Sequence, residues 1–149
     1  MKFSTREDID APIEEVFKAV SDFDAFERRM LRRGVDIRRD ETMPIDHVGA
    51  SWKAQFSWRG RTYDVDASLA EVSPGEGYVI ESRSNGVECL GGVELVALSK
   101  TRTRLFVSLD LKPQTLSARL LVQSLKLAKG NLNRRFKVRV HEFAKGLSH

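Results

Sequence analysis

The segment that decides the fold lies near the start of the chain. Residues 9–23 read IDAPIEEVFKAVSDF. Before it, residues 2–10 alternate loosely between apolar and polar side chains, which predicts a strand ending at Asp10-Ala11-Pro12. Proline suits the first position of a helix, because its missing N–H would have no partner there. The apolar residues that follow recur at steps of three and four and predict a short helix: Ile13, Val16, Phe17 and Val20.

A second short helix is predicted directly after the first. Either Asp22 or Asp24 can cap its N-terminus, and Asp24 has Glu27 three residues later, as in a capping box. Gly34 is expected to end this helix. The apolar residues that keep a helical spacing until then are Phe23, Phe26 and Met30.

From residue 35 to residue 113 the pattern changes to two-residue alternation, which places successive side chains on opposite faces of a sheet. The clearest hairpin joins residues 52–58 to residues 63–69 through a tight turn at Arg59-Gly60-Arg61. Its predicted inward side chains are Trp52, Ala54, Phe56, Trp58, Tyr63, Val65, Ala67 and Leu69. Turn residues bound further strands near 78–83, 87–98 and 102–112. The sequence therefore predicts an antiparallel meander with one solvated face.

A long amphipathic helix is predicted at the C-terminus, with Thr115 or Ser117 as its cap. Its apolar residues recur at steps of three and four: Leu121, Leu125, Ala128, Leu132, Phe136, Phe143 and Leu147. One straight helix over residues 115–147 would be about 50 Å long, against roughly 35 Å for the strands. One end is therefore expected to fray or overhang. Gly130 permits a bend without requiring one.

Length and composition exclude several classes of protein. The 149 residues, 41% hydrophobic and 31% charged, fit one globular domain over residues 1–149. No window approaches the roughly 18 apolar residues of a membrane span, and the charged N-terminus differs from a signal peptide, so a cytoplasmic protein is expected. Cys89 is the single cysteine, which excludes an intramolecular disulfide and a multi-cysteine metal site. No cofactor is predicted.

Basic residues are concentrated in the last 35 residues of the chain. Eight lie in residues 115–149 against the single acid Glu142: Arg119, Lys126, Lys129, Arg134, Arg135, Lys137, Arg139 and Lys145. This excess fits an electrostatic surface for anionic lipid, nucleic acid or an acidic partner. The simpler interpretation is the solvated side of an amphipathic helix.

The order of these elements resembles the helix-grip fold of the SRPBCC superfamily, which includes START lipid-transfer domains, pollen-allergen-like proteins, polyketide cyclases and coenzyme-Q-binding proteins. The most specific match is residues 9–17 followed by residues 20–23, which look like the N-terminal signature of the superfamily. The resemblance covers essentially the whole chain. It implies an α+β fold in which a curved antiparallel sheet of six or seven strands wraps around a long C-terminal helix. It also implies a cavity between sheet and helix that holds an apolar small molecule.

Eleven residues are candidates for lining such a cavity. They are the inward side chains of the sheet, the apolar stripe of the last helix with two cations at its edge, and two residues near the opening: Phe26, Met30, Trp52, Phe56, Trp58, Tyr63, Leu125, Lys129, Leu132, Phe136 and Arg139. The alternative is that these side chains pack together as a filled core.

No ordered catalytic constellation or metal-ligand spacing is present in the sequence. His47 could act as a mobile base at a pocket mouth, but a solvated loop histidine is the simpler interpretation. Cys89 is expected to point inward as an inert thiol. Asp64 and Asp66 share one strand face, on the solvated side of the sheet.

The leading hypothesis is therefore a carrier for a hydrophobic small molecule or lipid, which releases its ligand at an anionic membrane through the basic C-terminal helix. Arg139 and Lys129 lie at the edge of the apolar stripe, and the simpler interpretation is that these cations extend to water. The hypothesis is that one of them helps to hold an acidic or carbonyl-bearing ligand. The alternative is a polyketide cyclase- or dehydratase-type enzyme acting in the same cavity through scattered polar groups: Tyr63, Tyr78, His47 and Arg139. Nucleic-acid binding is not favoured, because the aromatic residues of the basic segment fall on its apolar stripe.

Overall fold

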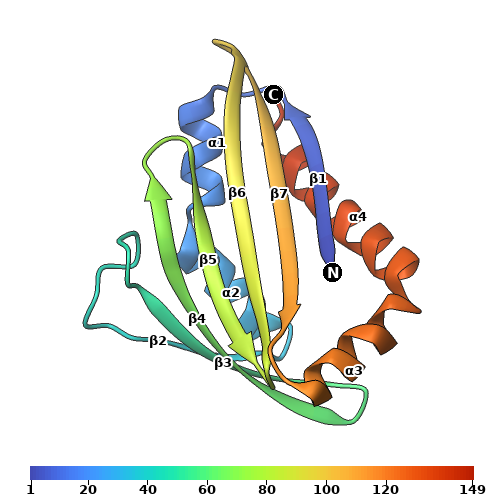
Figure 1. The fold of residues 1–149 in the computed structure, drawn as a ribbon. Helices are drawn as coiled ribbons and strands as arrows, with labels where there is room; N and C mark the ends of the chain where they lie inside the picture. The colour runs from blue at the N-terminus through green and yellow to red at the C-terminus, as the bar shows by residue number, and fades with distance from the viewer.

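The computed structural model describes residues 1–149, which form a seven-stranded antiparallel sheet and four helices (Figure 1). The strands are β1 (Lys2–Ile9), β2 (Asp36–Arg39), β3 (Ser51–Trp58), β4 (Arg61–Ser73), β5 (Gly77–Ser84), β6 (Val87–Ser99) and β7 (Arg102–Pro113). The helices are α1 (Ile13–Val20), α2 (Phe23–Arg32), α3 (Leu116–Lys126) and α4 (Lys129–Leu147). The predicted α+β helix-grip architecture is confirmed.

The sheet order is β1-β7-β6-β5-β4-β3-β2, so the first and second strands are its two edges. After β1, helices α1 and α2 carry the chain across to β2, and five hairpin connections return it to β7 beside β1. Two of these hairpins use two-residue turns with both φ angles positive, at Arg59-Gly60 and at Asn85-Gly86. This backbone matches the twist of paired strands, and glycine adopts it without steric cost.

The segment from residue 9 to residue 23 forms the predicted strand end and helix, except that Pro12 is the extended N-cap of α1 and not its first helical residue. The chain leaves β1 at Ile9 and enters α1 through Pro12, and the apolar face of α1 buries Val16 and Val20. Of the two candidate caps for α2, Asp22 is the one that accepts a hydrogen bond from the Ala25 N–H, at 3.1 Å.

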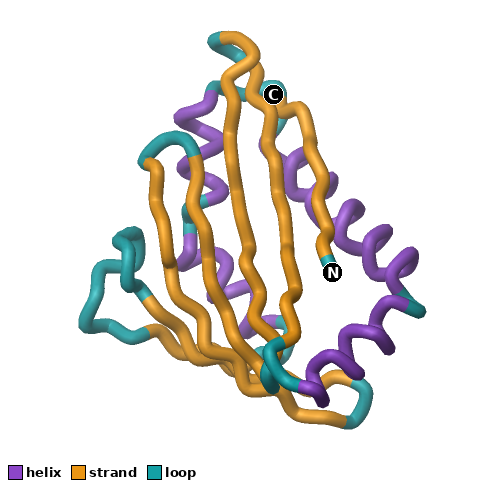
Figure 2. The backbone as a smooth tube through the Cα atoms, in the orientation of Figure 1, coloured by secondary structure: helices purple, strands orange, loops and turns teal.

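The C-terminal helix differs from the single helix that the sequence predicts. It is capped by Thr115, whose hydroxyl accepts from the Ala118 N–H at 3.1 Å, but it breaks at Leu127-Ala128 into α3 and α4. Both residues at the break donate to carbonyls three positions earlier, which tightens the last turn of α3. The break replaces the expected overhang, since it turns α4 back along β1 (Figure 2). No helix combines the length and the apolar composition needed to cross a bilayer.

Two small hydrophobic clusters form the core, both between the helices and the inner face of the sheet. The first contains Ile9, Ala11, Val16, Val20, Leu95, Leu105 and Ala144. The second contains Phe23, Ala50, Trp52 and Leu69. Tyr78 on β5 packs against both clusters and joins them.

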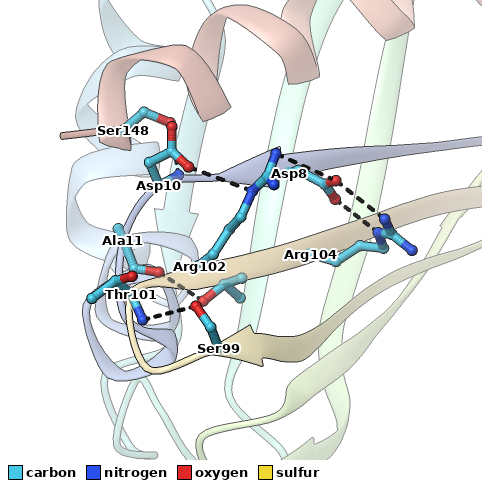
Figure 3. A network of polar contacts seen from close by, with 9 residues as sticks. Asp8, Asp10, Ala11, Ser99, Thr101, Arg102, Arg104 and Ser148 are labelled. Atoms are coloured by element: carbon cyan, nitrogen blue, oxygen red, sulfur yellow. Dashed lines mark hydrogen bonds and ion pairs between the residues drawn. The ribbon is translucent and has the colours of Figure 1, made fainter.

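Polar contacts tie the end of the chain to its beginning (Figure 3). Arg104 on β7 donates two hydrogen bonds to the Asp8 carboxylate, at 2.7 and 3.1 Å. The buried Thr103 hydroxyl donates to the Ala11 carbonyl at 2.8 Å. Ser148, just after α4, accepts from the Asp10 N–H at 3.0 Å. The Ser148 contact holds the end of α4 against the β1–α1 connection, and the Arg104 and Thr103 contacts fasten β7 to β1 and to that connection.

Candidate ligand-binding groove

A groove of about 820 Å³ lies between α2, α4 and the inner face of the sheet. Fifteen residues line it, and ten of them are hydrophobic. The apolar walls are Val20, Phe26, Met30, Tyr78, Val93, Leu105, Val107, Val140, Phe143 and Leu147. Its volume is within the range of small-molecule pockets, roughly 300–1,000 Å³.

Strand register forms the floor of the groove. Tyr78, Val93 and Val107 are paired neighbours on β5, β6 and β7, so their side chains form a row across the inner face. The roof is a contact between the two helices: the rings of Phe26 on α2 and Phe143 on α4 have centroids 5.8 Å apart. Both helices therefore have to hold their positions for the groove to keep its shape.

Three arginines give the groove a basic rim. Arg29 comes from α2, Arg33 directly follows the last residue of that helix, and Arg139 comes from α4; all three are exposed. The Arg29 guanidinium lies 5.4 Å from the ring centroid of Phe26 and 5.6 Å from that of Phe143, within the range of cation–π contacts. None of the three forms an ion pair with a carboxylate. Glu142 is the single acid in the lining, so positive charge dominates the rim.

Tyr78 is the polar group at the floor of the groove. Its hydroxyl donates to the Val20 carbonyl at 2.6 Å, and its ring meets that of Phe23 edge-on, with centroids 5.1 Å apart. Burial raises the pKa of Tyr78 well above its ordinary value. The phenol therefore stays protonated at neutral pH, and its proton is already committed to a backbone carbonyl.

Of the eleven predicted lining residues, the groove brings together Phe26, Met30 and Arg139. Phe26 is half-buried under the helix contact, whereas Met30 is 43% exposed at the opening. Whether these side chains touch a ligand stays a prediction.

The predicted aromatic residues of β3 and β4 lie outside this groove. Trp52 is buried in the second cluster, where its indole N–H donates to the Glu27 carboxylate at 2.7 Å. Tyr63 stacks on Phe56 with centroids 5.3 Å apart and contacts Trp58 at 6.4 Å. Trp52 therefore packs in the core, as the filled-core alternative describes. Phe56 is 37% exposed and Trp58 is half-buried, so the aromatic group of Phe56, Tyr63 and Trp58 lies outside both core clusters.

The four remaining candidates belong to α3 and the first half of α4. Leu125 and Leu132 are half-buried, and Phe136 packs on Phe3 of β1 with centroids 6.2 Å apart. Lys129 is exposed at the first residue of α4, whereas the groove takes its α4 residues from Arg139 onward.

Sequence reasoning missed the other twelve lining residues, among them Arg29 and Arg33 at the rim and Val93 and Val107 at the floor. It placed Phe143 only on the helical stripe. One available signal was spacing, because Arg29 follows Phe26 by three residues and shares its helix face. No local signal showed that this face of α2 would meet α4.

The groups considered for catalysis are dispersed. His47 lies in an exposed loop beside Asp46, with Nδ1 and Oδ1 2.8 Å apart. Cys89 is half-buried, and burial raises the pKa of its thiol. The Asp64 carboxylate accepts a hydrogen bond from the Gln55 side chain at 2.8 Å. No cluster of three or more metal-ligating side chains occurs.

A smaller hollow of about 350 Å³ lies over β3, β4 and β5. Charged side chains dominate its lining, among them Lys53, Asp66 and Arg83, which are cross-strand neighbours. Such alternating charges typify a solvated sheet face, and this hollow offers no apolar wall comparable to that of the groove.

No family model and no curated protein matches the chain, but many solved structures do. A norcoclaurine synthase point mutant from Thalictrum flavum, in complex with a transition-state analogue, is 11% identical with a TM-score of 0.67, over 99% of this chain and 93% of that chain. The aromatase/cyclase Zhui from a Streptomyces species is 10% identical with a TM-score of 0.63, over 90% of this chain and 88% of that chain. A protein from Thermus thermophilus is 15% identical with a TM-score of 0.63, over the full length of both chains. At these identities the likeness shows the fold alone: the chain has the helix-grip fold that these proteins share.

Proposed function

We propose that the protein binds and carries a hydrophobic small molecule or lipid with an acidic or carbonyl-bearing head. The observation that carries the proposal is the groove itself, an apolar trough of about 820 Å³ with three arginines at its rim. The apolar body of the ligand would lie on the row formed by Tyr78, Val93 and Val107. Burial of such a body removes apolar surface from water, which is the main source of affinity in sites of this kind.

The rim supports a ligand with an anionic head. A guanidinium presents paired N–H donors that match a carboxylate or phosphate. Arg29 is held in place by two aromatic rings, and neither it nor Arg139 is neutralised by a protein carboxylate within ion-pair distance. In this proposal Arg139 has the role that the sequence suggests for it, and Arg29 shares that role.

Release of the ligand at an anionic membrane surface belongs to the same proposal. The segment from residue 115 to residue 149 carries eight basic residues and one acid. Each Lys or Arg near an anionic surface adds about 1 kcal/mol of attraction. The basic C-terminal helices are therefore the part of the molecule best suited to meet such a surface.

The experiment is native mass spectrometry of the freshly purified protein, followed by organic extraction and identification of bound molecules. The expected result is a stoichiometric apolar adduct. Val140→Trp fills the groove from α4 and should abolish the adduct, whereas Val138→Trp, two residues away and 48% exposed, should retain it. An adduct that survives Val140→Trp would place the ligand elsewhere.

The head group is tested on the extracted ligand. Arg139→Gln should weaken its binding by roughly tenfold or more, which corresponds to the loss of one charge-assisted hydrogen bond. Lys137→Gln removes the same charge from an exposed position of the same helix outside the groove and should leave affinity unchanged. Equal affinities for all three proteins would overturn the role of Arg139.

The enzymatic alternative requires a proton-transfer group against the substrate. Among the candidate groups, Tyr78 and Arg139 line the groove, whereas Tyr63 and His47 do not. The Tyr78 hydroxyl already donates its hydrogen bond to the Val20 carbonyl, so it is not free to protonate a substrate. This favours a carrier over a cyclase or dehydratase. Turnover of an extracted ligand, lost on Tyr78→Phe with binding intact, would reverse this preference.

A further inference from the structure

Three leucines of the C-terminal segment face solvent. Leu116 is 75% exposed, Leu120 is 61% exposed, and Leu127, at the break between the helices, is 92% exposed. We refer to Leu116, Leu120 and Leu127 as the leucine ridge. Single exposed apolar residues need no explanation, but a clustered set on one element marks an interaction surface.

The ridge occupies one side of α3. At about 100° per residue, its three members fall within a sector of about 40°. The opposite side of α3 carries Ala118 and Val122, which are buried. Along the axis the ridge spans roughly 16 Å, at 1.5 Å per residue. Helix α3 therefore has two apolar faces, of which the protein covers one.

Positive charge lies along one flank of the ridge. Arg119 and Lys126 lie beside it on α3, and Lys129 follows at the start of α4; all three are exposed. No acidic residue occurs between residue 115 and residue 141. The elbow between α3 and α4 also projects away from the sheet, beyond the β1 edge (Figure 1). Leu127 and Lys129, which lie at this elbow, are thus presented on a protruding part of the molecule.

We propose that the leucine ridge inserts into the surface of an anionic lipid bilayer while the cations beside it contact lipid head groups. A short convex row of aliphatic side chains flanked by cations is the arrangement by which interfacial helices bind, with the apolar side in the acyl boundary and the charges at the head groups. The inference deepens the proposed membrane contact by naming its anchoring residues. It does not depend on what the groove holds.

The test is co-sedimentation of the full chain with vesicles of phosphatidylcholine alone and of phosphatidylcholine with phosphatidylglycerol. The wild-type protein should bind the anionic vesicles at low salt. The triple variant Leu116→Ser/Leu120→Ser/Leu127→Ser should bind them at least about tenfold more weakly, because burial of even one leucine changes an association constant by roughly that factor. Leu98→Ser removes a leucine that is 42% exposed at the far end of β6, and it should bind like wild type.

Two further measurements distinguish leucine insertion from electrostatic attraction. Arg119→Gln/Lys126→Gln should weaken binding to anionic vesicles, and wild-type binding should fall as salt rises. Each variant should fold like the wild type, because all substituted side chains are exposed. Circular dichroism checks this expectation.

Each alternative outcome overturns the inference in a distinct way. Absence of wild-type binding to anionic vesicles would remove the membrane contact altogether, while the adduct measurement would still report on the groove. Equal vesicle binding by the triple-serine variant would reduce the contact to electrostatics. A wild-type dimer that dissociates in that variant, or capture by soluble polyglutamate with the same leucine dependence, would assign the ridge to a second copy or to an acidic protein.

Discussion

Replacement of Tyr78 by phenylalanine removes one hydroxyl from the floor of the groove and keeps the ring. That hydroxyl donates to the Val20 carbonyl at 2.6 Å. Val20 is the last residue of α1, so its carbonyl lacks a partner within the helix, and the residue is only 3% exposed. The substitution therefore leaves a buried acceptor without this donor.

The expected cost is about 1–3 kcal/mol of unfolding free energy, the usual penalty for a buried polar group left unsatisfied. For a protein of this size, each kcal/mol corresponds to about 2–4 °C in Tm, so a decrease of roughly 2–12 °C is expected. Urea denaturation followed by tryptophan fluorescence gives the free energy, and calorimetry gives the Tm. The edge-to-face contact with Phe23 should persist, because the ring remains.

The matched control is Tyr63→Phe. Tyr63 is 8% exposed, and its ring stacks on that of Phe56. Its hydroxyl is not a buried, unpartnered group, so its removal should leave no buried polar atom unsatisfied. This variant should change Tm by no more than about 1–2 °C, as expected when no buried hydrogen bond is lost. Equal effects of the two substitutions would refute the assigned role of the Tyr78 hydroxyl. In the carrier interpretation, both variants should still contain the extracted ligand.

Three further predictions concern the rest of the molecule. The Cys89 thiol, whose pKa is raised by burial, should react with a disulfide reagent at pH 8 at least about tenfold more slowly in the folded protein than in urea; equal rates would contradict its burial. The hydrogen bond from Arg104 holds the pKa of Asp8 below its ordinary value of 3.8. The pair should therefore stabilise the protein above about pH 4, and this contribution should be lost as the pH falls further. Urea denaturation between pH 3 and pH 6 should show a smaller acid-dependent loss of unfolding free energy for Asp8→Asn than for the wild type. Gly130→Ala should stabilise α4 by up to about 1 kcal/mol, because a Cβ at this position meets no atom within 4 Å; a lower Tm would show that the bend needs the glycine.

The parts of the fold that local chemistry determines were predictable from sequence. The apolar spacing in residues 9–23 defines α1 and the start of α2. Gly34, two residues after the end of α2, has a positive φ of 86°, as expected for a residue that stops a helix. Period-two alternation defines which side chains of β3 and β4 share a face. Each of these signals acts between residues close in the chain, so no knowledge of tertiary contacts is needed to interpret them.

The break at Leu127-Ala128 has no such signal. The apolar stripe continues across it at steps of three and four, as a single helix requires. Beyond the break, α4 packs along β1, which is a contact between the two ends of the chain that no local pattern reports. Lys129 and Arg139 both belong to α4, but Lys129 is its first residue and lies about 15 Å along the axis from Arg139, so it falls outside the groove.

The candidate site was only partly predictable for a related reason. Two-residue alternation identifies the inner face of a strand, but it carries no information about which positions along that face a helix covers. Trp52 and Val93 both lie on the inner face, yet the first is packed under α2 and the second lines the groove. The lining is determined by where α2 and α4 approach each other, and the pair Phe26 and Phe143 that sets this approach is separated by more than a hundred residues.

The groove follows from the way the core is divided. One cluster joins α1 and α4 to β6 and β7, and the other joins α2 to β3 and β4, so the apolar side chains do not close over the sheet between them. Tyr78 packs against both clusters and lines the groove, so the residue that joins the two halves of the core is also part of the site. Filling the seam with larger side chains would bury more apolar surface and stabilise the fold, but it would remove the space for a ligand. The unfilled seam is therefore the feature that most directly links the stability of this protein to the function proposed for it, and groove-filling at Val140 should raise Tm while abolishing the adduct.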